Sequence, residues 1–140
     1  SANLLSANLY GANLLSANLY GADLRRANLH GADLSAFQIP QEGALIVWKA
    51  VDGGIAKIEV PAEAKRTACL INRKCRAEYV RTLEIIIKGK QVTDAIGRYD
   101  SGTKYIVGEI TRPDSYNDDP REDCTNGIHF FLTREEAEKW

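Results

Sequence analysis

The chain has 140 residues, of which 44% are hydrophobic and 26% are charged, and its formal net charge is −1. This composition supplies one modest core beyond the repeats described below. No apolar run approaches the roughly 18 residues of a membrane-spanning helix, so we expect no membrane contact. The 3 cysteines lack the even number and regular spacing of a disulfide framework, so we expect a reducing compartment and a cytoplasmic location.

Residues 1–34 repeat an Ala-(Asn/Asp)-Leu triplet every five residues. This period fits neither the roughly 3.6 residues of a helical turn nor the roughly 2 of a strand, so each unit must form one side of a larger coil. We expect leucine and alanine to stack on the next coil, and the Asn or Asp side chain to bond nearby backbone at a tight turn. The leucines of this predicted core are Leu4, Leu9, Leu14, Leu19, Leu24, Leu29 and Leu34.

These residues resemble the pentapeptide-repeat family, which implies a right-handed quadrilateral β-helix with four pentapeptides in each coil. Continuing the register gives an eighth unit, with Phe37 in the alanine position and Ile39 in the leucine position, so the resemblance implies about two coils over residues 1–40. Phe37 is too large for the alanine position of a continuing stack. We therefore expect Phe37 to close the core and Pro40 to stop the winding.

Some pentapeptide-repeat proteins mimic duplex DNA and bind topoisomerases, and that likeness implies a long acidic surface. Residues 1–43 carry 3 acidic and 2 basic side chains, which makes a short, nearly neutral stem and a poor DNA mimic. The chain has no Met and starts within a repeat, so we expect a trimmed or processed form of a longer solenoid. An open first coil exposes unpaired backbone, which predicts a homodimer stacked through residues 1–20.

A second domain is predicted over residues 41–140, where the repeat stops and Val, Ile, Lys and Arg become frequent. Residues 44–51 and 55–60 are typical of two strands, and the Asp-Gly-Gly sequence between them indicates a hairpin turn. The stretch 62–77 fits either a helical turn or an extended chain. We expect the next strand over residues 78–88.

A polar connection is expected between Gly89 and Gly102, followed by a strand over residues 104–111. Residues 112–124 form a loop rich in turn formers and carboxylates, and residues 128–132 form a short strand. A capping box formed by Thr133 and Glu136 then starts a helix that runs to the last residue. The result is a small α+β domain.

Three segments, residues 73–79, 105–109 and 123–140, are similar to a C-terminal domain of unknown function that follows pentapeptide repeats in bacteriophage and some bacterial proteins. The likeness spans residues 44–140 nearly completely. It implies this two-part architecture and a bacterial or phage-infected cell as the setting. It implies no mechanism.

Cys124 and His129 are the strongest candidates for a reactive pair in the domain, because a thiolate beside an imidazole can act as nucleophile and base. The sequence identifies no third group to orient them. A structural, hydrogen-bonded His129 is the alternative interpretation. A ligand pocket that contains both side chains would favour a functional role, and a filled core around them would favour the structural one.

A zinc site is a further hypothesis, in which three thiolates and one imidazole would bind the metal. Its ligands would be Cys69, Cys75, Cys124 and His129. The spacings between them differ from the short Cys-x-x-Cys knuckles of most zinc sites. We therefore predict no metal and no other cofactor.

Basic residues gather between positions 65 and 81, where a phosphate or nucleic-acid contact is one interpretation. The candidate binding residues are Arg66, Arg73, Lys74 and Arg76. The alternative is that they face solvent or pair with the acidic loop, since residues 44–140 hold 16 basic and 16 acidic side chains.

The strand and helix from residue 127 to the end are also similar to a short segment of ADP-ribosyltransferase folds, where such a pair lies beside an NAD pocket. This likeness implies Tyr105 and His129 as candidate contacts. The usual catalytic glutamate has no counterpart that we can place.

Together these observations predict a non-enzymatic structural or interaction protein, in which a β-helical stem carries a cap that binds another macromolecule. A protein partner is favoured over a nucleic acid. The alternative is an enzyme or nucleotide-binding module, ADP-ribosyltransferase-like or Cys/His-dependent, centred on Cys124 and His129.

Overall fold

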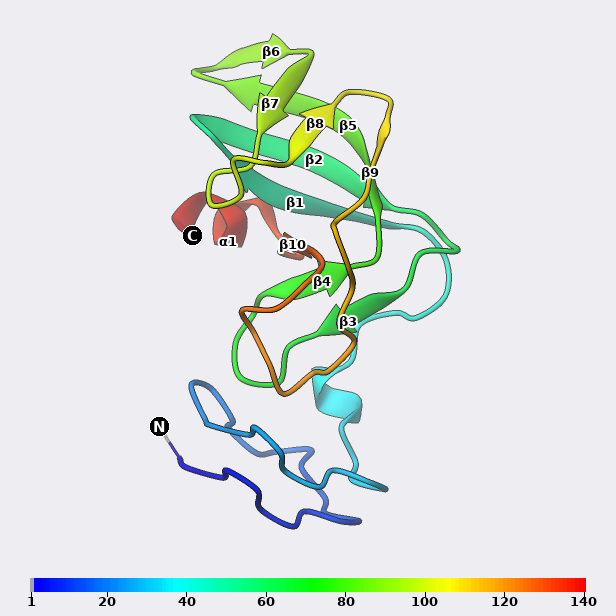
Figure 1. Cartoon of the computed structure of the whole chain (residues 1–140), viewed down its shortest axis with the longest axis vertical. Helices are drawn as coiled ribbons and strands as arrows, with labels where there is room; N and C mark the ends of the chain where they lie inside the picture. The colour runs from blue at the N-terminus through cyan, green and yellow to red at the C-terminus, as the bar shows by residue number, and fades with distance from the viewer. Residues whose placement is uncertain (1) are drawn as a thin grey trace.

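The computed structural model describes residues 2–140. The repeats form a stem at one end of the molecule, and the remaining chain forms a β-rich domain above it, with the C-terminus on the domain (Figure 1). Within residues 2–140, no helix has the length and apolar character needed to cross a membrane.

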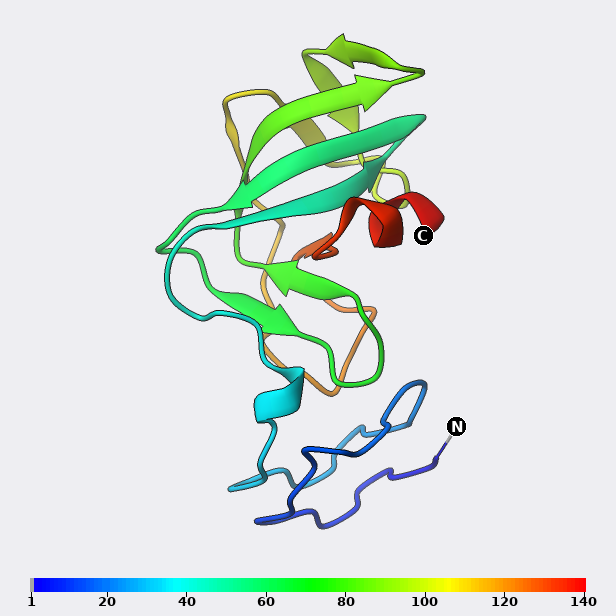
Figure 2. The same cartoon turned by 180° about the vertical axis from the view of Figure 1, so that it is seen from behind.

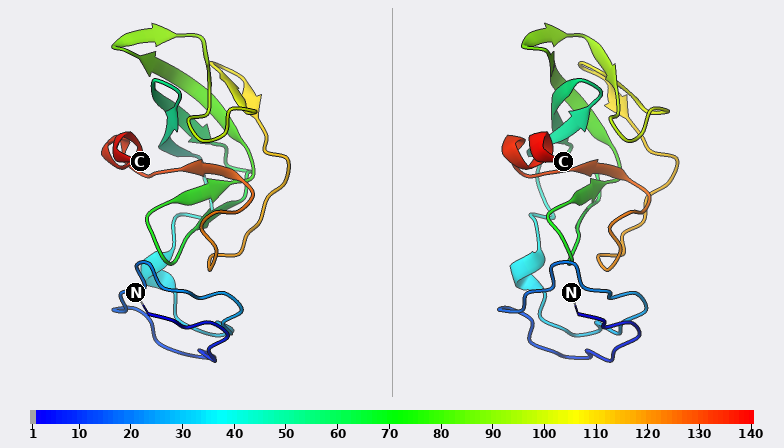
Figure 3. Two further views of the ribbon diagram at one scale, coloured as in Figure 1. Left: turned by 60° about the vertical axis from the view of Figure 1, so that its left-hand side comes forward. Right: turned by 90° about the vertical axis from the view of Figure 1, so that its left-hand side faces the viewer.

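Two layers of chain lie on each other in the stem, and they are joined by parallel backbone bridges. Each bridge joins residues twenty positions apart, which is the length of four pentapeptides. The bridged pairs are Asn3 with Asp23, Asn8 with Asn28, and Asn13 with Asp33. Side views show the first coil at the far end of the stem from the domain (Figure 3).

The polar residue of each unit makes the turn that the sequence predicts. In all seven units its side-chain oxygen accepts a hydrogen bond from the backbone N–H two residues later, as Asn8 does from Tyr10 at 3.1 Å. The residue that opens a unit has a positive φ at five of the turns, Ser6, Gly11, Gly21, Arg26 and Gly31, with 66° at Gly11 and 61° at Arg26. Glycine adopts this conformation without strain, which explains its recurrence there.

The stem core is covered by the other domain. Leu19 and Leu24 are buried, and the other five leucines of the Ala-(Asn/Asp)-Leu triplets are partly buried around them. Phe37 packs on this cluster as expected, at the end of a 3₁₀ turn over Ser35–Phe37. The cover comes from Leu70, a residue of the second domain that is buried in the same cluster.

Ile39 was expected in the stem core, and this prediction is wrong. Its side chain is buried in the main core of the second domain. The 3₁₀ turn takes the chain out of the coil before residue 39 is reached, so the five-residue register no longer sets its direction. The winding therefore ends ahead of Pro40.

A five-stranded antiparallel sheet forms the larger layer of the domain (Figure 2). Its strand order is β1-β2-β5-β6, with β9 beside β5. The strands are β1 (Leu45–Val51), β2 (Gly54–Val60), β5 (Val80–Ile87), β6 (Lys90–Val92) and β9 (Ile110–Thr111). The predicted hairpin of the first two strands and the predicted strand near residues 78–88 are confirmed.

A second sheet and a short hairpin complete the domain. The sheet has the order β10-β4-β3, and β7 pairs with β8. These strands are β3 (Arg66–Ala68), β4 (Cys75–Ala77), β7 (Asp94–Ile96), β8 (Lys104–Ile106) and β10 (Ile128–Phe130). The main core lies where β1, β2 and β5 meet β4, β8 and β10.

Helix α1 (Arg134–Lys139) begins as the capping box predicts. The Thr133 hydroxyl accepts a hydrogen bond from the backbone N–H of Glu136 at 3.2 Å. Ala137 packs with Ile55 and Phe131 in a small cluster, so the helix covers the opposite face of β1 and β2.

The stretch 62–77, for which the sequence allowed two structures, takes the extended one and holds the strands β3 and β4. Two other predictions need correction. The single strand predicted over residues 104–111 is interrupted, because the chain turns at Gly108 with a φ of 88° and the Gly108 N–H donates to the carbonyl of Thr82 at 2.8 Å. The polar connection before it also contains β6 and β7.

Candidate functional site

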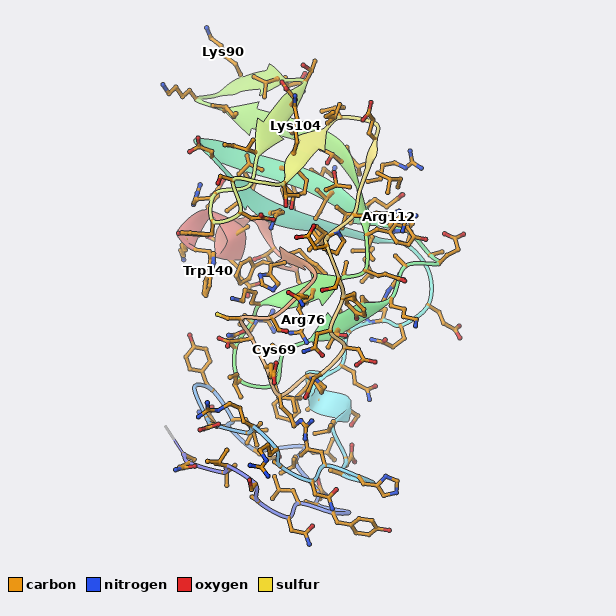
Figure 4. The ribbon with its side chains drawn as sticks, in the orientation of Figure 1. Cys69, Arg76, Lys90, Lys104, Arg112 and Trp140 are labelled. Atoms are coloured by element: carbon orange, nitrogen blue, oxygen red, sulfur yellow. The ribbon has the colours of Figure 1, made fainter. Side chains whose placement is uncertain are left out.

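A cavity of about 720 Å³ opens on the second domain beside the C-terminus. Its walls come from β1, the start of β4, β10, the loop before β8, the loop before β10 and Trp140. Trp140 lies at the end of α1 (Figure 4). The size is in the range of small-ligand sites, which are roughly 300–1,000 Å³.

Cys124 and His129 both line this cavity, as the functional interpretation of the pair requires. The structure does not join them as nucleophile and base. The His129 Nε2 lies 2.8 Å from the Thr125 carbonyl oxygen, which can only accept, so Nε2 carries the ring proton. The Cys124 thiol instead accepts a weak hydrogen bond from the Lys74 ammonium, with Nζ 3.6 Å from Sγ.

His129 is held as a neutral imidazole. Burial lowers its pKa to about 4, and the nearby ammonium groups of Lys74 and Lys49 act in the same direction. A base with such a low pKa accepts a proton poorly at neutral pH. The environment therefore suits a positioned hydrogen-bonding group better than a general base.

Acid should destabilise the protein through His129. The folded pKa of about 4 lies below the unfolded value of 6.5, so the unfolded chain binds more protons between these two pH values. Stability is fully present above pH 6.5 and falls towards pH 4, by about 2–3 kcal/mol. Urea unfolding across this range should show the loss. His129→Gln, which keeps a donor for Thr125, should remove most of it.

His30→Gln is the matched control, because His30 is an exposed histidine on the stem. It should leave the acid loss unchanged. An equal acid loss in the wild type and in His129→Gln would contradict the assignment to His129.

The zinc hypothesis is not supported by the geometry. Among residues 2–140, no group of three or more His, Cys, Asp or Glu side chains is placed to hold a metal. Cys69 and Cys75 are buried and Cys124 is exposed. Burial raises the pKa of Cys75 to about 12, which keeps its thiol protonated.

The four basic candidates do not form one exposed patch. Arg66 and Arg76 are buried and donate to backbone carbonyls, including those of Pro40 and Asn117. Arg73 is exposed and forms an ion pair with Glu136, with 2.8 Å between Nε and Oε2. Lys74 is buried against the cavity. The nucleic-acid interpretation therefore has no common exposed surface among these four residues.

Tyr105 lies behind the cavity wall, with its ring centre 5.6 Å from Lys49 Nζ. Its side chain is buried in the main core and does not line the cavity. Within residues 2–140 its hydroxyl finds no hydrogen-bond partner, and burial raises its pKa. Tyr105 and His129 therefore do not line the same cavity.

Two lining residues, Lys49 and Trp140, were missed as site candidates. The sequence did hold a signal for the first. Strand alternation places Lys49 on the same face as Val47 and Val51, both of which are buried. A lysine within such a buried face needs a partner or a cavity. The role of Trp140 depends on the placement of α1, which no local pattern fixes.

A model described as a family of unknown function (DUF5758) matches residues 35–137. The chain belongs to this DUF5758 family. A pentapeptide-repeat model of eight copies matches residues 2–36, directly before it. The predicted order, repeats followed by a domain of unknown function, is thus confirmed, and most residues that line the cavity lie within the matched DUF5758 range. Neither the curated proteins nor the solved structures give a significant match to the chain.

Proposed function

We propose that the protein is a non-enzymatic recognition protein, in which the stem fixes a DUF5758 domain whose cavity binds a group of a macromolecular partner. The observation that carries this proposal is the cavity itself, which has polar walls but no joined nucleophile and base. A protein partner is favoured over a nucleic acid, because Arg66 and Arg76 are buried. We place this role in the cytoplasm of a bacterial or phage-infected cell.

The stem is proposed as a right-handed quadrilateral β-helix of about two coils. The bridges between residues twenty positions apart and the repeated turns support this geometry. Hydrogen bonds between the stem and the domain support the proposal that the stem is a rigid support. The Gly21 N–H donates to the Ile71 carbonyl at 2.7 Å, and the Arg121 guanidinium donates to the Ala27 carbonyl at 2.5 Å.

Affinity capture with two matched variants tests the proposal. Ser115→Trp places a large side chain at an exposed position of the cavity wall, and Tyr10→Ser changes an exposed residue of the stem. The wild type and Tyr10→Ser should capture the same partner, also after nuclease treatment, and Ser115→Trp should lose it at least tenfold. Capture lost by Tyr10→Ser and kept by Ser115→Trp would move recognition to the stem and contradict the proposal.

A second candidate function is a nucleotide-binding or Cys/His-dependent enzyme. One observation favours it, because Cys124 and His129 line the same cavity. Calorimetric titration with NAD separates the candidates: heat of binding that disappears in Ser115→Trp would favour the second. The predicted homodimer through the first coil is a further proposal, and sedimentation at high concentration tests it.

A further inference from the structure

Two lysine ammonium groups reach the cavity with unused hydrogen-bond donors. Each ammonium has three N–H donors. Lys49 Nζ donates to the His129 carbonyl at 2.9 Å, and Lys74 Nζ has the weak thiol acceptor of Cys124 at 3.6 Å. Within residues 2–140, neither lysine takes part in an ion pair. Most of their donors are therefore available to an acceptor in the cavity.

The inner part of the cavity is electrostatically suited to an anion. The pKa of Lys49 is lowered to about 8, mainly by burial; Asp100 acts against this shift, and the positive charge of Lys74 adds to it. Asp100 and Asp114 also line the cavity, but both are exposed, as is Lys139. Two like charges held near each other inside a protein are costly, and an anion between them offsets this cost.

An aromatic side chain lies beside the ammonium groups. Lys74 Nζ is 4.7 Å from the centre of the Trp140 ring, and Phe131 also lines the cavity, with its ring centre 5.3 Å from that of Trp140. The cavity of about 720 Å³ is much larger than a single inorganic anion needs. The walls therefore suit a group with a charged end and a flat apolar body.

We propose that the cavity binds an aromatic or apolar group bearing a carboxylate or a phosphate, with the anionic end between Lys49 and Lys74 and the body against Trp140. This inference rests on the proposed function and names the chemistry of the group that the partner inserts. A carboxylate and a phosphate offer the same acceptor oxygens to an ammonium.

Titration of the isotope-labelled full chain with small probes, followed by the backbone amide signals, tests this inference. Benzoate and phenyl phosphate supply the two anions on one aromatic body, and benzamide is the neutral control. At least one anion should shift the signals of Thr125 and His129, and benzamide should bind at least tenfold more weakly. A larger response to phenyl phosphate would identify a phosphorylated group, and a larger response to benzoate a carboxylate. Benzamide binding as tightly as both anions would overturn the inference.

Substitutions at the two lysines provide a second test of the anion site. Lys74→Met and Lys49→Met should each weaken binding of the anion about tenfold or more, since each removes a charge-assisted contact. Lys90→Met is the control, because Lys90 is exposed at the end of the domain farthest from the stem, away from Trp140 (Figure 4). Unchanged affinity in Lys74→Met would overturn the inference, whether or not Lys49→Met folds.

The experiments distinguish failure of the anion site from failure of the proposed recognition function. If neither anion binds, but Ser115→Trp still abolishes capture of the partner, the anionic group is excluded and cavity recognition stands. If an anion binds and Ser115→Trp still captures the partner, the anion site stands and the macromolecular role of the cavity is excluded.

Discussion

Replacing Arg76 with methionine should destabilise the protein by about 3–5 kcal/mol, because three partly buried backbone carbonyls lose their donor at once. The Arg76 side chain lies in the middle of the small sheet and is 1% exposed. Its guanidinium donates to the carbonyls of Asn117 at 2.9 Å and Glu122 at 2.6 Å, and also to that of Asp119. Methionine fills a similar volume and offers no N–H group.

The effect should extend to the stem, because the loop that Arg76 holds also contacts it. The Pro120 carbonyl accepts from the Leu70 N–H at 2.8 Å, and Arg121 donates to the Ala27 carbonyl at 2.5 Å. Figure 4 shows Arg76 close to this loop, above the stem. A loosened loop would therefore weaken the attachment of the two parts.

Arg73→Met is the matched control, since Arg73 is exposed and its ion pair lies on the surface. Such pairs contribute about 1 kcal/mol or less. Arg76→Lys should fall between the two variants, because one ammonium cannot reach three carbonyls in the fork geometry of a guanidinium. Urea unfolding gives the three values. A loss in Arg76→Met no larger than that in Arg73→Met would refute the structural role assigned to Arg76.

The stem could be predicted closely because each unit repeats the same local chemistry. A strict period of five allows few structures, and an Asn or Asp oxygen bonds its own turn wherever the unit occurs. The prediction failed where the repeat ended. Ile39 kept the correct register in the sequence, but the 3₁₀ turn before it had already redirected the chain into the second domain.

The interpretation of the basic cluster failed for a different reason. A run of arginines is usually solvated, and the buried state of Arg66 and Arg76 depends on carbonyls supplied by distant loops. Arg76 reaches carbonyls 41 to 46 positions away in the chain. No local spacing reports such a contact. Short strands such as β3 and β4 are also too brief for a clear alternation.

The candidate site was predicted in part. Cys124 and His129 do lie on one cavity, because the turn between them brings the end of the acidic loop back along β10. The expected thiol and imidazole contact is replaced by a lysine on one side and a backbone carbonyl on the other. Lys49 lies on β1 of the larger sheet and Lys74 directly precedes β4 of the smaller one, so their approach follows from tertiary packing and not from sequence spacing.

Leu24→Ala should destabilise the stem by about 3–4 kcal/mol, since Leu24 is 0% exposed and the stem has few other buried side chains. The substitution removes the buried methyl groups of Leu24 and leaves a cavity beside Leu19 and Leu70. Leu5→Ala is the control at another leucine of the repeat, which is 47% exposed. That variant should cost less than about 1 kcal/mol.

The same variant shows whether the stem and the domain unfold together. Both tryptophans, Trp48 and Trp140, belong to the domain, so their fluorescence follows the domain alone, whereas circular dichroism follows both parts. Leu70 of the domain is buried in the stem core, which couples the two cores through direct contact. Leu24→Ala should therefore lower the midpoint of thermal unfolding seen by fluorescence as much as that seen by circular dichroism. A fluorescence midpoint equal to that of the wild type would mean that the domain is stable without the stem, and that the stem contributes position and not stability.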